Sequence, residues 1–266
     1  MIGSKARHPR WLAVLPASVW LAFARPPTPV LAQRADRALS TNVNGWYGYA
    51  GNHAIAKAYS VLLDAEVRRW RVAAAPQQVL LRGAVVRSLG AAATAGAGYG
   101  FFWNSPYGDF SDAFASPEHR IFEQLGLAHD IGTVAVAHRL RLEHRGTGQQ
   151  ADHDRDGDAR VTTWTFANRG RYQALGTIPL RGSAPDPGAL SAELGDEVFV
   201  NLGPTARQTT LDQNRVSLGF SVRWSRTTTV YAGYMHQLIV QHAARALEAN
   251  HTLRLALHSD ASFSGR

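Results

Sequence analysis

Apolar and polar residues alternate along most of the chain, most clearly in "LDQNRVSLGFSVRWS", residues 211–225. Every second residue from Val216 to Trp224 is apolar, whereas the residues between and beside them include Arg215 and Arg223. Successive side chains of a β-strand point to opposite faces. This period of two therefore predicts a strand with one apolar and one polar face.

Segments of this kind follow one another from residue 45 to residue 258, separated by turn residues. Several are about twice the length of an average strand in a soluble protein. They are long enough to cross a bilayer as tilted strands, which takes about 9–11 residues. The eleven segments span residues 45–51, 58–71, 79–89, 93–103, 118–129, 134–145, 161–180, 190–202, 215–225, 228–241 and 252–258.

The connections between these segments alternate in length. Longer polar connections, such as residues 104–117 and 146–159, follow the even-numbered segments, whereas the intervening ones are mostly short, such as residues 130–132. Long loops on one side and tight turns on the other are typical of an outer-membrane barrel.

The apolar faces point either into a soluble barrel or toward lipid. Eleven long strands enclose a lumen too wide to fill with valine and leucine, and Lys57 is the only lysine after residue 32. Tryptophans near segment ends suggest the aromatic belts of membrane barrels. We therefore predict an all-β, transmembrane, antiparallel up-and-down β-barrel of about 10–12 strands. The tryptophans are Trp46, Trp70, Trp103, Trp164 and Trp224.

The count of eleven conflicts with the even strand numbers of bacterial single-chain barrels. Either a further strand lies within residues 33–44, giving twelve, or residues 45–51 are not a membrane strand, giving ten. The aromatic and glycine residues of "GWYGYAG", residues 45–51, suit a barrel wall. We therefore predict twelve strands.

The first 32 residues read as an export signal, with a basic start, an apolar run at 11–24 and small residues at Val30 and Ala32. We therefore predict a signal peptide at 1–32 and a single barrel domain at 33–266. The signal contains four of the 28 Lys and Arg residues and no acid, so the formal charge falls from +8 to +4. That charge is too small to indicate nucleic acid as a partner. The absence of cysteine excludes disulfides and thiolate chemistry.

Charged residues recur on the polar faces and would line the lumen. They form either a charged channel lining or anion site, or a paired network that fills the barrel. The near balance of signs favours the paired network, because buried charges persist when they are paired. The residues are Glu66, Arg68, Arg87, Arg139, Arg141, Glu143, Arg169, Arg171, Glu193, Glu197, Arg215 and Arg223. Arg82 and His236 instead fall on the apolar side of their segments.

Other candidate chemistry is sparse. Asp152, Asp154 and Asp156 have the spacing of a calcium loop, but Thr163 stands where the bidentate glutamate is needed. We expect a soluble external loop without tight calcium. The chain contains neither G-x-S-x-G nor H-E-x-x-H, so we assign no catalytic residue, metal or cofactor. A Ser/His/Asp hydrolase is recognised by geometry rather than by spacing, so it stays as an alternative.

Three stretches, "DEVFVNLG" (196–203), "LDQNRVSLGFSV" (211–222) and "YAGYMHQ" (231–237), resemble a family of bacterial outer-membrane β-barrel proteins catalogued as a domain of unknown function. The resemblance implies the outer membrane of a Gram-negative bacterium, with outer-membrane lipid and the barrel-insertion machinery as partners. It implies no activity. We expect a non-enzymatic structural barrel or narrow pore with a charged lumen, of unknown solute. The alternative is a membrane-embedded lipid hydrolase.

Overall fold

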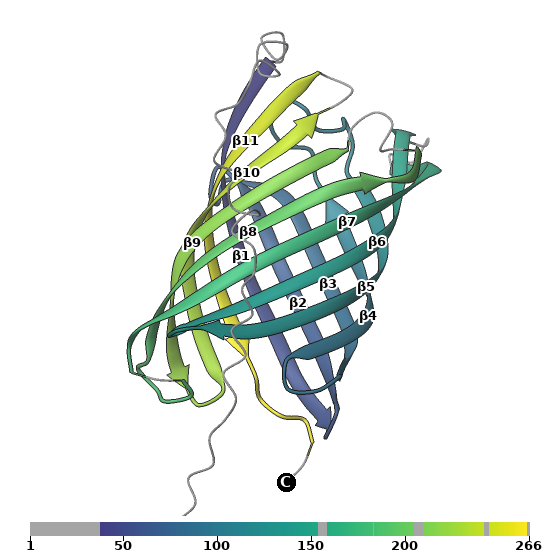
Figure 1. Cartoon of the computed structure of the whole chain (residues 1–266). Coiled ribbons are helices and arrows are strands. Elements are labelled where there is room, and N and C mark those ends of the chain that lie inside the picture. Colours follow the sequence, from purple (N-terminus) through teal and green to yellow (C-terminus); the bar gives the residue numbers. More distant parts are fainter. Residues whose placement is uncertain (1–37, 154–158, 183, 205–209, 242–244, 265–266) are drawn as a thin grey trace, which may run out of the picture. The chain divides into compact units, whose positions relative to one another are not determined.

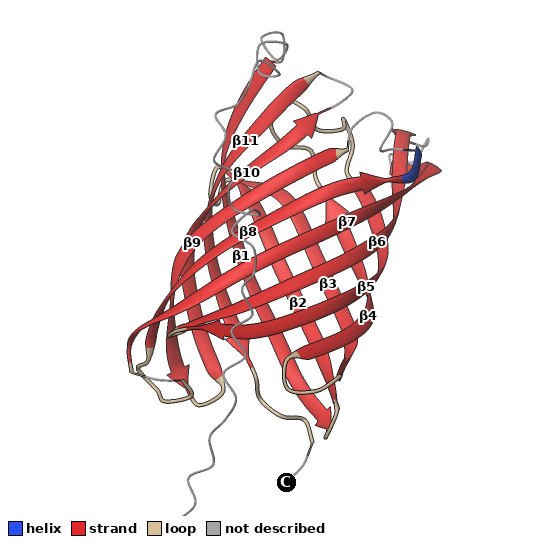
Figure 2. Ribbon diagram, viewed as in Figure 1, coloured by secondary structure: helices blue, strands red, loops and turns tan. Residues whose placement is uncertain are grey.

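The computed structural model describes residues 38–153, 159–182, 184–204, 210–241 and 245–264. The predicted signal peptide lies outside these ranges. The described strands form one sheet that closes into a barrel, as Figures 1 and 2 show. The all-β barrel fold predicted from the alternation is therefore confirmed. Within the described ranges, no helix has both the length and the apolar character needed to cross a membrane.

Each of the eleven predicted segments corresponds to one strand of the described chain. The bounds agree fully for the eighth and tenth segments, whereas most of the other strands extend beyond the predicted segment. The strands are β1 (Ala38–Ala56), β2 (Tyr59–Trp70), β3 (Ala75–Ser88), β4 (Ala93–Asn104), β5 (Ser116–Ile131), β6 (Val134–His153), β7 (Ala159–Arg181), β8 (Leu190–Leu202), β9 (Leu211–Ser225), β10 (Thr228–Gln241) and β11 (Ala246–Ser259).

The barrel closes between β1 and β11, and this pair is parallel. Its register runs from Ala38 beside Ala246 to Gly51 beside Ser259. The prediction of twelve strands is wrong, because residues 38–44 are the beginning of β1. With an odd number of strands, antiparallel neighbours leave the first and last strands running in the same direction. The seam must then be parallel, so β1 begins at the end that carries the long connections (Figure 1).

Residues that follow β11 reinforce this seam. The backbone amides of Phe263 and Ser264 donate to the carbonyl of Ala54 on β1, at 2.9 and 3.0 Å. His53 Nδ1 donates to the carbonyl of Ala261 at 2.7 Å, and its ring stacks on Phe263 with 4.1 Å between centroids. The chain after β11 therefore covers the end of β1.

The outer face of the barrel is apolar, as the alternation predicted. Leu218 is 54% exposed and Phe220 is similarly exposed, whereas Ser221 on the opposite face is buried in the lumen.

Two of the tryptophans that we expected in an aromatic belt on the outer face instead point into the lumen. Trp46 is 3% exposed and lies in the lumen, where its Nε1 donates to Gln77. Trp70 Nε1 donates to the lumen residue Asn42, so the belt prediction is wrong for Trp46 and Trp70.

A loop narrows the end of the barrel that carries the long connections. Residues 105–115 join β4 to β5, yet they contact strands that are not neighbours of either. Tyr107 Oη donates to Glu248 of β11 at 2.9 Å, and Ser40 Oγ of β1 donates to Asp109 at 2.7 Å. The loop therefore crosses part of the barrel mouth.

Candidate functional site

Glu143 of β6 is the centre of the largest charged cluster in the lumen. Its carboxylate is 1% exposed and accepts two hydrogen bonds from Arg169, at 3.0 and 2.6 Å. Arg171 Nη1 donates to the other carboxylate oxygen at 2.5 Å, and Arg120 Nη1 lies 3.8 Å away. Three guanidinium groups therefore surround one buried carboxylate, an arrangement that compensates part of their desolvation.

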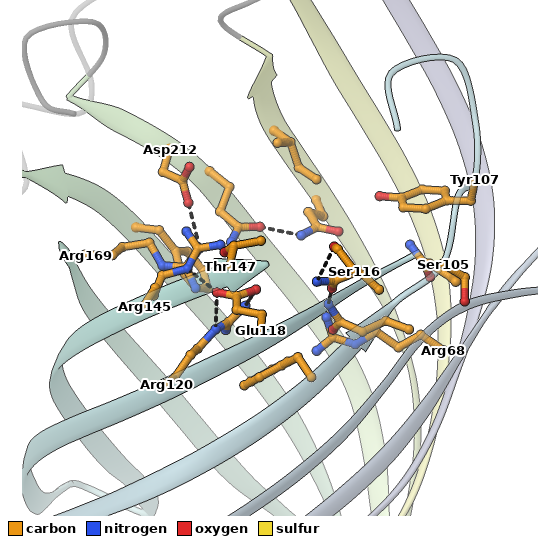
Figure 3. A pocket seen from close by; sticks show the side chains of 18 of the residues that line it. Arg68, Ser105, Tyr107, Ser116, Glu118, Arg120, Arg145, Thr147, Arg169 and Asp212 are labelled. Atoms are coloured by element: carbon orange, nitrogen blue, oxygen red, sulfur yellow. Dashed lines mark hydrogen bonds and ion pairs between the residues drawn. The ribbon is translucent and has the colours of Figure 1, made fainter. Parts of the chain in front are cut away.

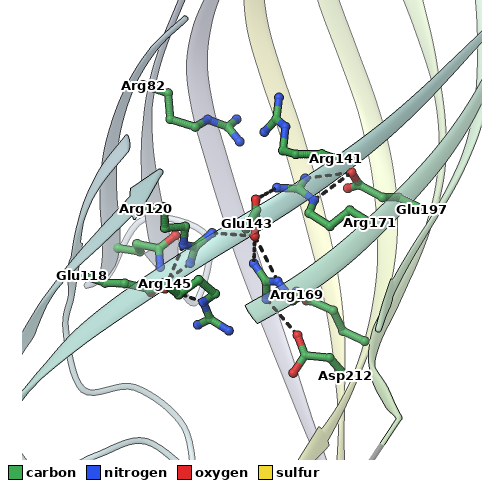
Figure 4. Close-up of polar contacts among 12 residues, drawn as sticks. Arg82, Glu118, Arg120, Arg141, Glu143, Arg145, Arg169, Arg171, Glu197 and Asp212 are labelled. Carbon is green, nitrogen blue, oxygen red and sulfur yellow. Dashed lines mark hydrogen bonds and ion pairs between the residues drawn. The ribbon is translucent and has the colours of Figure 1, made fainter. Parts of the chain in front are cut away.

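Two further glutamates extend the cluster around the wall. Glu197 of β8 accepts hydrogen bonds from Arg171 and Arg139, and Arg215 Nη1 lies 3.6 Å from it. Glu118 of β5 accepts from Arg120 and from Arg145. Cross-strand neighbours such as Glu143 and Arg169 are adjacent in register. The result is a chain of alternating charges across β5 to β9, drawn in Figure 4.

Aromatic rings support the arginines from the lumen wall. Phe199 is fully buried, and the guanidinium carbons of Arg169, Arg171 and Arg215 lie within 4.5–4.9 Å of its ring centroid. Arg68 lies 3.6 Å above Trp46. Cation–π contacts of this kind stabilise a guanidinium that has lost water. Phe199 was not among the predicted lumen residues, although it shares the face of Glu197 in the alternation of its segment.

Glycines on β4 make room for this packing. A Cβ added to Gly100 would lie 2.7 Å from Arg82 Cγ, and one added to Gly98 would lie 2.7 Å from Phe122 Cζ. The glycines of this strand thus have a physical cause, since side chains of neighbouring strands occupy the space that a Cβ at these positions would need.

The structure places most of the predicted lumen residues together. Those that gather around the two central glutamates are Arg139, Arg141, Glu143, Arg169, Arg171, Glu197 and Arg215. Glu66 and Arg68 pair at 2.6 Å on β2. Glu193 and Arg223 lie toward the short-turn end of the lumen, where Arg223 donates to Asp260 at 3.0 Å.

Strand β3 departs from the predicted sides. Arg87 is exposed on the outer face, 5.9 Å from the ring of Tyr59, so its assignment to the lumen is wrong. Arg82, which the pattern put on the apolar side, points inward and pairs with Asp64. Val85 is exposed and Val86 is buried. Because β3 is apolar on both faces, its period does not reveal which face is the lumen.

The predicted list of lumen charges did not include Glu118, Arg120, Arg145 and Asp212. The spacing of two between Glu118 and Arg120 was an available signal, since it puts both on one face. We call the following set of lumen charges the charged girdle. It comprises nine arginines and six carboxylates, a net charge of +3. Its members are Asp64, Glu66, Arg68, Arg82, Glu118, Arg120, Arg139, Arg141, Glu143, Arg145, Arg169, Arg171, Glu197, Asp212 and Arg215.

A cavity of about 310 Å³ opens on the girdle from the long-loop end. Seven arginines but only three carboxylates line it, so its lining is strongly positive. Figure 3 shows Tyr107 of the 105–115 loop across the cavity from Arg120, Arg145 and Arg169. Burial, and the Glu248 carboxylate beside it, raise the pKa of Tyr107. The phenol therefore stays neutral and able to donate.

A second cavity, of about 420 Å³, lies at the short-turn end. Its lining includes Glu193, Arg223, His258 and Asp260. No residue lines both cavities, so the described residues enclose two separate cavities, one toward each end of the barrel.

The described residues contain no group of three or more potential metal ligands from His, Cys, Asp and Glu. The acidic stretch with Asp154 and Asp156 lies outside the ranges that the structure describes, so the expected absence of calcium there stays a prediction. In the same described part of the chain, no serine hydroxyl is hydrogen-bonded to a histidine ring.

Comparison with known proteins matches a family model and finds similarity to a solved structure. The family model described as "Protein of unknown function (DUF2490)" matches residues 43–248. A solved structure titled "NanC porin structure in rhombohedral crystal form" matches with a TM-score of 0.42 and 11% sequence identity. That match covers 78% of this chain and 93% of the other chain. No curated protein matches the chain.

Proposed function

We propose that this chain, which belongs to the DUF2490 family of proteins of unknown function, forms a narrow pore. The pore would lie in the outer membrane of a Gram-negative bacterium. The proposal has two parts, the membrane location and the pore. The long connections face the outside of the cell and the short turns face the periplasm, as in other outer-membrane barrels.

The apolar outer face supports the membrane location. Leucine, isoleucine, valine and aromatic side chains are exposed on strands all around the barrel, Leu81, Ile121, Leu140 and Leu255 among them. In water such a surface would promote aggregation, whereas in a bilayer it faces hydrocarbon. A closed sheet also satisfies every backbone group across the bilayer. Outer-membrane lipid and the barrel-insertion machinery are the partners that this location requires.

The two lumen cavities, one toward each end of the barrel, carry the pore proposal. The lumen is too wide to be filled by apolar side chains, and it retains the nine arginines of the charged girdle. A lumen lined by charged side chains and hollowed toward both ends is suited to the passage of small polar solutes.

Conductance of the purified protein tests the pore directly. The refolded chain is added to a planar bilayer in potassium chloride, and stepwise current increases are expected. Correct folding is checked separately by circular dichroism and by resistance to detergent at room temperature. A correctly folded barrel that gives no current would overturn the pore proposal in favour of a sealed structural barrel.

Lipid turnover by the same preparation tests the alternative. The pore proposal predicts no release of fatty acid from phospholipid vesicles. Sustained deacylation that is lost on mutation of a single serine and a single histidine would identify a hydrolase instead.

A further inference from the structure

Two arginines of the charged girdle, Arg68 and Arg215, meet over one indole ring in the lumen. The guanidinium carbon of Arg68 lies 3.6 Å from the centroid of the Trp46 ring, and that of Arg215 lies 5.0 Å from it. The two groups are therefore close together, although β2 and β9 are not neighbours in the barrel. The strongest charge interaction of Arg215 with another side chain is repulsion by Arg68. An anion between two such cations would relieve this repulsion.

The donors of Arg68 that remain free are accessible from the cavity at the long-loop end. Arg68, labelled in Figure 3, and Arg215 both line this cavity, which has a volume of about 310 Å³. Arg68 Nε donates to Glu66 at 2.6 Å, and Glu66 does not line the cavity. Among the described residues, Nη1 and Nη2 of Arg68 have no hydrogen-bond partner, and neither nitrogen is sealed from solvent. The side chain is 13% exposed, so a solute in the cavity can contact it.

The contacts of Arg215 on the cavity side are with neutral amides. Gln213 Oε1 accepts from Arg215 Nη2 at 3.4 Å. Gln237, with its amide oxygen turned toward Arg215, accepts from Nε and Nη2 at 3.2 Å. Both glutamines line the cavity, whereas Glu197, which lies 3.6 Å from Arg215 Nη1, does not. The amides therefore hold Arg215 in place without neutralising its charge.

The carboxylates that line the cavity leave this arginine pair uncompensated. Seven arginines and three carboxylates form its charged lining. Among the described residues, none of the three carboxylates forms an ion pair with Arg68 or Arg215. The cavity is also at the lower end of the range of small-molecule sites, which is about 300–1,000 Å³. It therefore combines excess positive charge with room for a small anionic solute.

We infer that Arg68 and Arg215 form a binding site for one small oxyanion, a carboxylate or a phosphate, in the cavity at the long-loop end. The inference rests on the proposed pore and deepens it by naming the class of solute that the pore admits. Planar guanidinium groups match the geometry of carboxylates and phosphates and bind them through paired N–H donors. The anion accepts hydrogen bonds from both arginines and separates their charges, while the Trp46 ring supports both guanidinium groups.

Binding of inorganic phosphate to the full-length barrel in detergent micelles tests the site without requiring conduction. Isothermal titration is expected to show one phosphate per chain. Arg215→Gln should weaken binding by about tenfold or more, since it removes charge-assisted hydrogen bonds. This variant should fold, because Glu197 keeps its hydrogen bonds from Arg139 and Arg171. No saturable binding to the wild type, or equal binding to Arg215→Gln, would overturn the inference.

The matched control is Arg223→Gln. It removes an arginine that lines the cavity at the short-turn end, so phosphate affinity should stay within about twofold of the wild type. A loss as large as that of Arg215→Gln would mean that phosphate responds to the general charge of the lumen and not to a site on Arg68 and Arg215.

Arg68→Lys tests the second arginine while keeping the positive charge beside Glu66. The ammonium group lacks the planar paired donors of a guanidinium, so phosphate affinity should fall by about threefold or more. Unchanged affinity would remove Arg68 from the site and contradict the inference.

Gln237→Glu adds a charge instead of removing one. The new carboxylate stands beside Arg215 Nε and Nη2, so it supplies an internal anion in the same cavity. The barrel should fold at least as well as the wild type, while phosphate affinity should fall by about tenfold or more. If Gln237→Glu folds and binds phosphate as tightly as the wild type, the anion is not held by Arg215.

The two proposals fail in different measurements. Phosphate binding by a barrel that gives no current would leave the site intact and overturn the pore. A pore whose chloride current is blocked equally by phosphate in the wild type and in Arg215→Gln would stand without the site. If both proposals hold, phosphate blocks the wild-type current saturably, and Gln237→Glu needs about tenfold more phosphate for the same block.

Discussion

Replacing Glu143 by glutamine removes the negative charge around which Arg120, Arg169 and Arg171 are arranged. The side chain is 1% exposed and keeps its shape in the variant, so the change isolates the charge. Breaking a buried ion pair by removing one partner typically costs about 3–5 kcal/mol. The amide oxygen still accepts one hydrogen bond, so we expect the lower end, about 3 kcal/mol. The measurement is urea unfolding of the barrel in lipid vesicles, followed by tryptophan fluorescence.

The matched control is Asp130→Asn, because Asp130 is an exposed carboxylate near the β5–β6 turn. It should change the free energy of unfolding by no more than about 0.5 kcal/mol. A loss of less than about 1 kcal/mol for Glu143→Gln would refute the reasoning, since it is the size expected for an exposed pair. Such a result would mean that water reaches the carboxylate freely and screens its partners.

Three further outcomes follow from the faces of the barrel and its loops. Leu218→Arg should destabilise the barrel by about 2–4 kcal/mol if this residue lies near the bilayer midplane. Ser217→Arg, on the lumen side, should destabilise it less. Equal losses of stability in vesicle-folding assays would contradict the assigned faces. Tyr107→Phe combined with Ser40→Ala removes two hydrogen bonds that hold the 105–115 loop across the barrel mouth. Single-channel conductance of this double variant should therefore rise. An unchanged conductance would show that the loop does not limit the current. Calorimetric titration should detect no micromolar calcium binding by the acidic segment 152–158, and a micromolar dissociation constant would contradict the prediction.

The period of two was enough to locate every strand and most of the faces. Leu218 and Ser221, for example, lie on the sides that their places in the alternation predicted. The rule works where one face is charged, because each arginine or glutamate on that face identifies the lumen. It failed on β3, where Val85 and Val86 are equally apolar and the side of Arg87 cannot be inferred from its neighbours.

Other features depend on partners that are distant in sequence. Phe199 shares the lumen face of Glu197 and Asn201, but only the structure shows that arginines from β7 and β9 pack on its ring. The parallel seam arises from the parity of the strand number and not from any property of β1 or β11. Arg141 was assigned to a paired network from the general balance of signs, yet only the three-dimensional arrangement shows that no described carboxylate pairs with it.

Accessibility of single cysteines along residues 216–222 tests most directly whether the apolar face meets lipid and the other face meets the lumen. The chain contains no cysteine, so each substitution creates a unique site for a nitroxide label. With the barrel in vesicles, labels at residues 216, 218, 220 and 222 should be relaxed preferentially by oxygen, which partitions into lipid. Labels at residues 217 and 221 should be relaxed by a water-soluble nickel complex, giving a period of two. A reversed phase, or access of the nickel complex to both sets, would contradict a membrane-spanning barrel with a polar lumen.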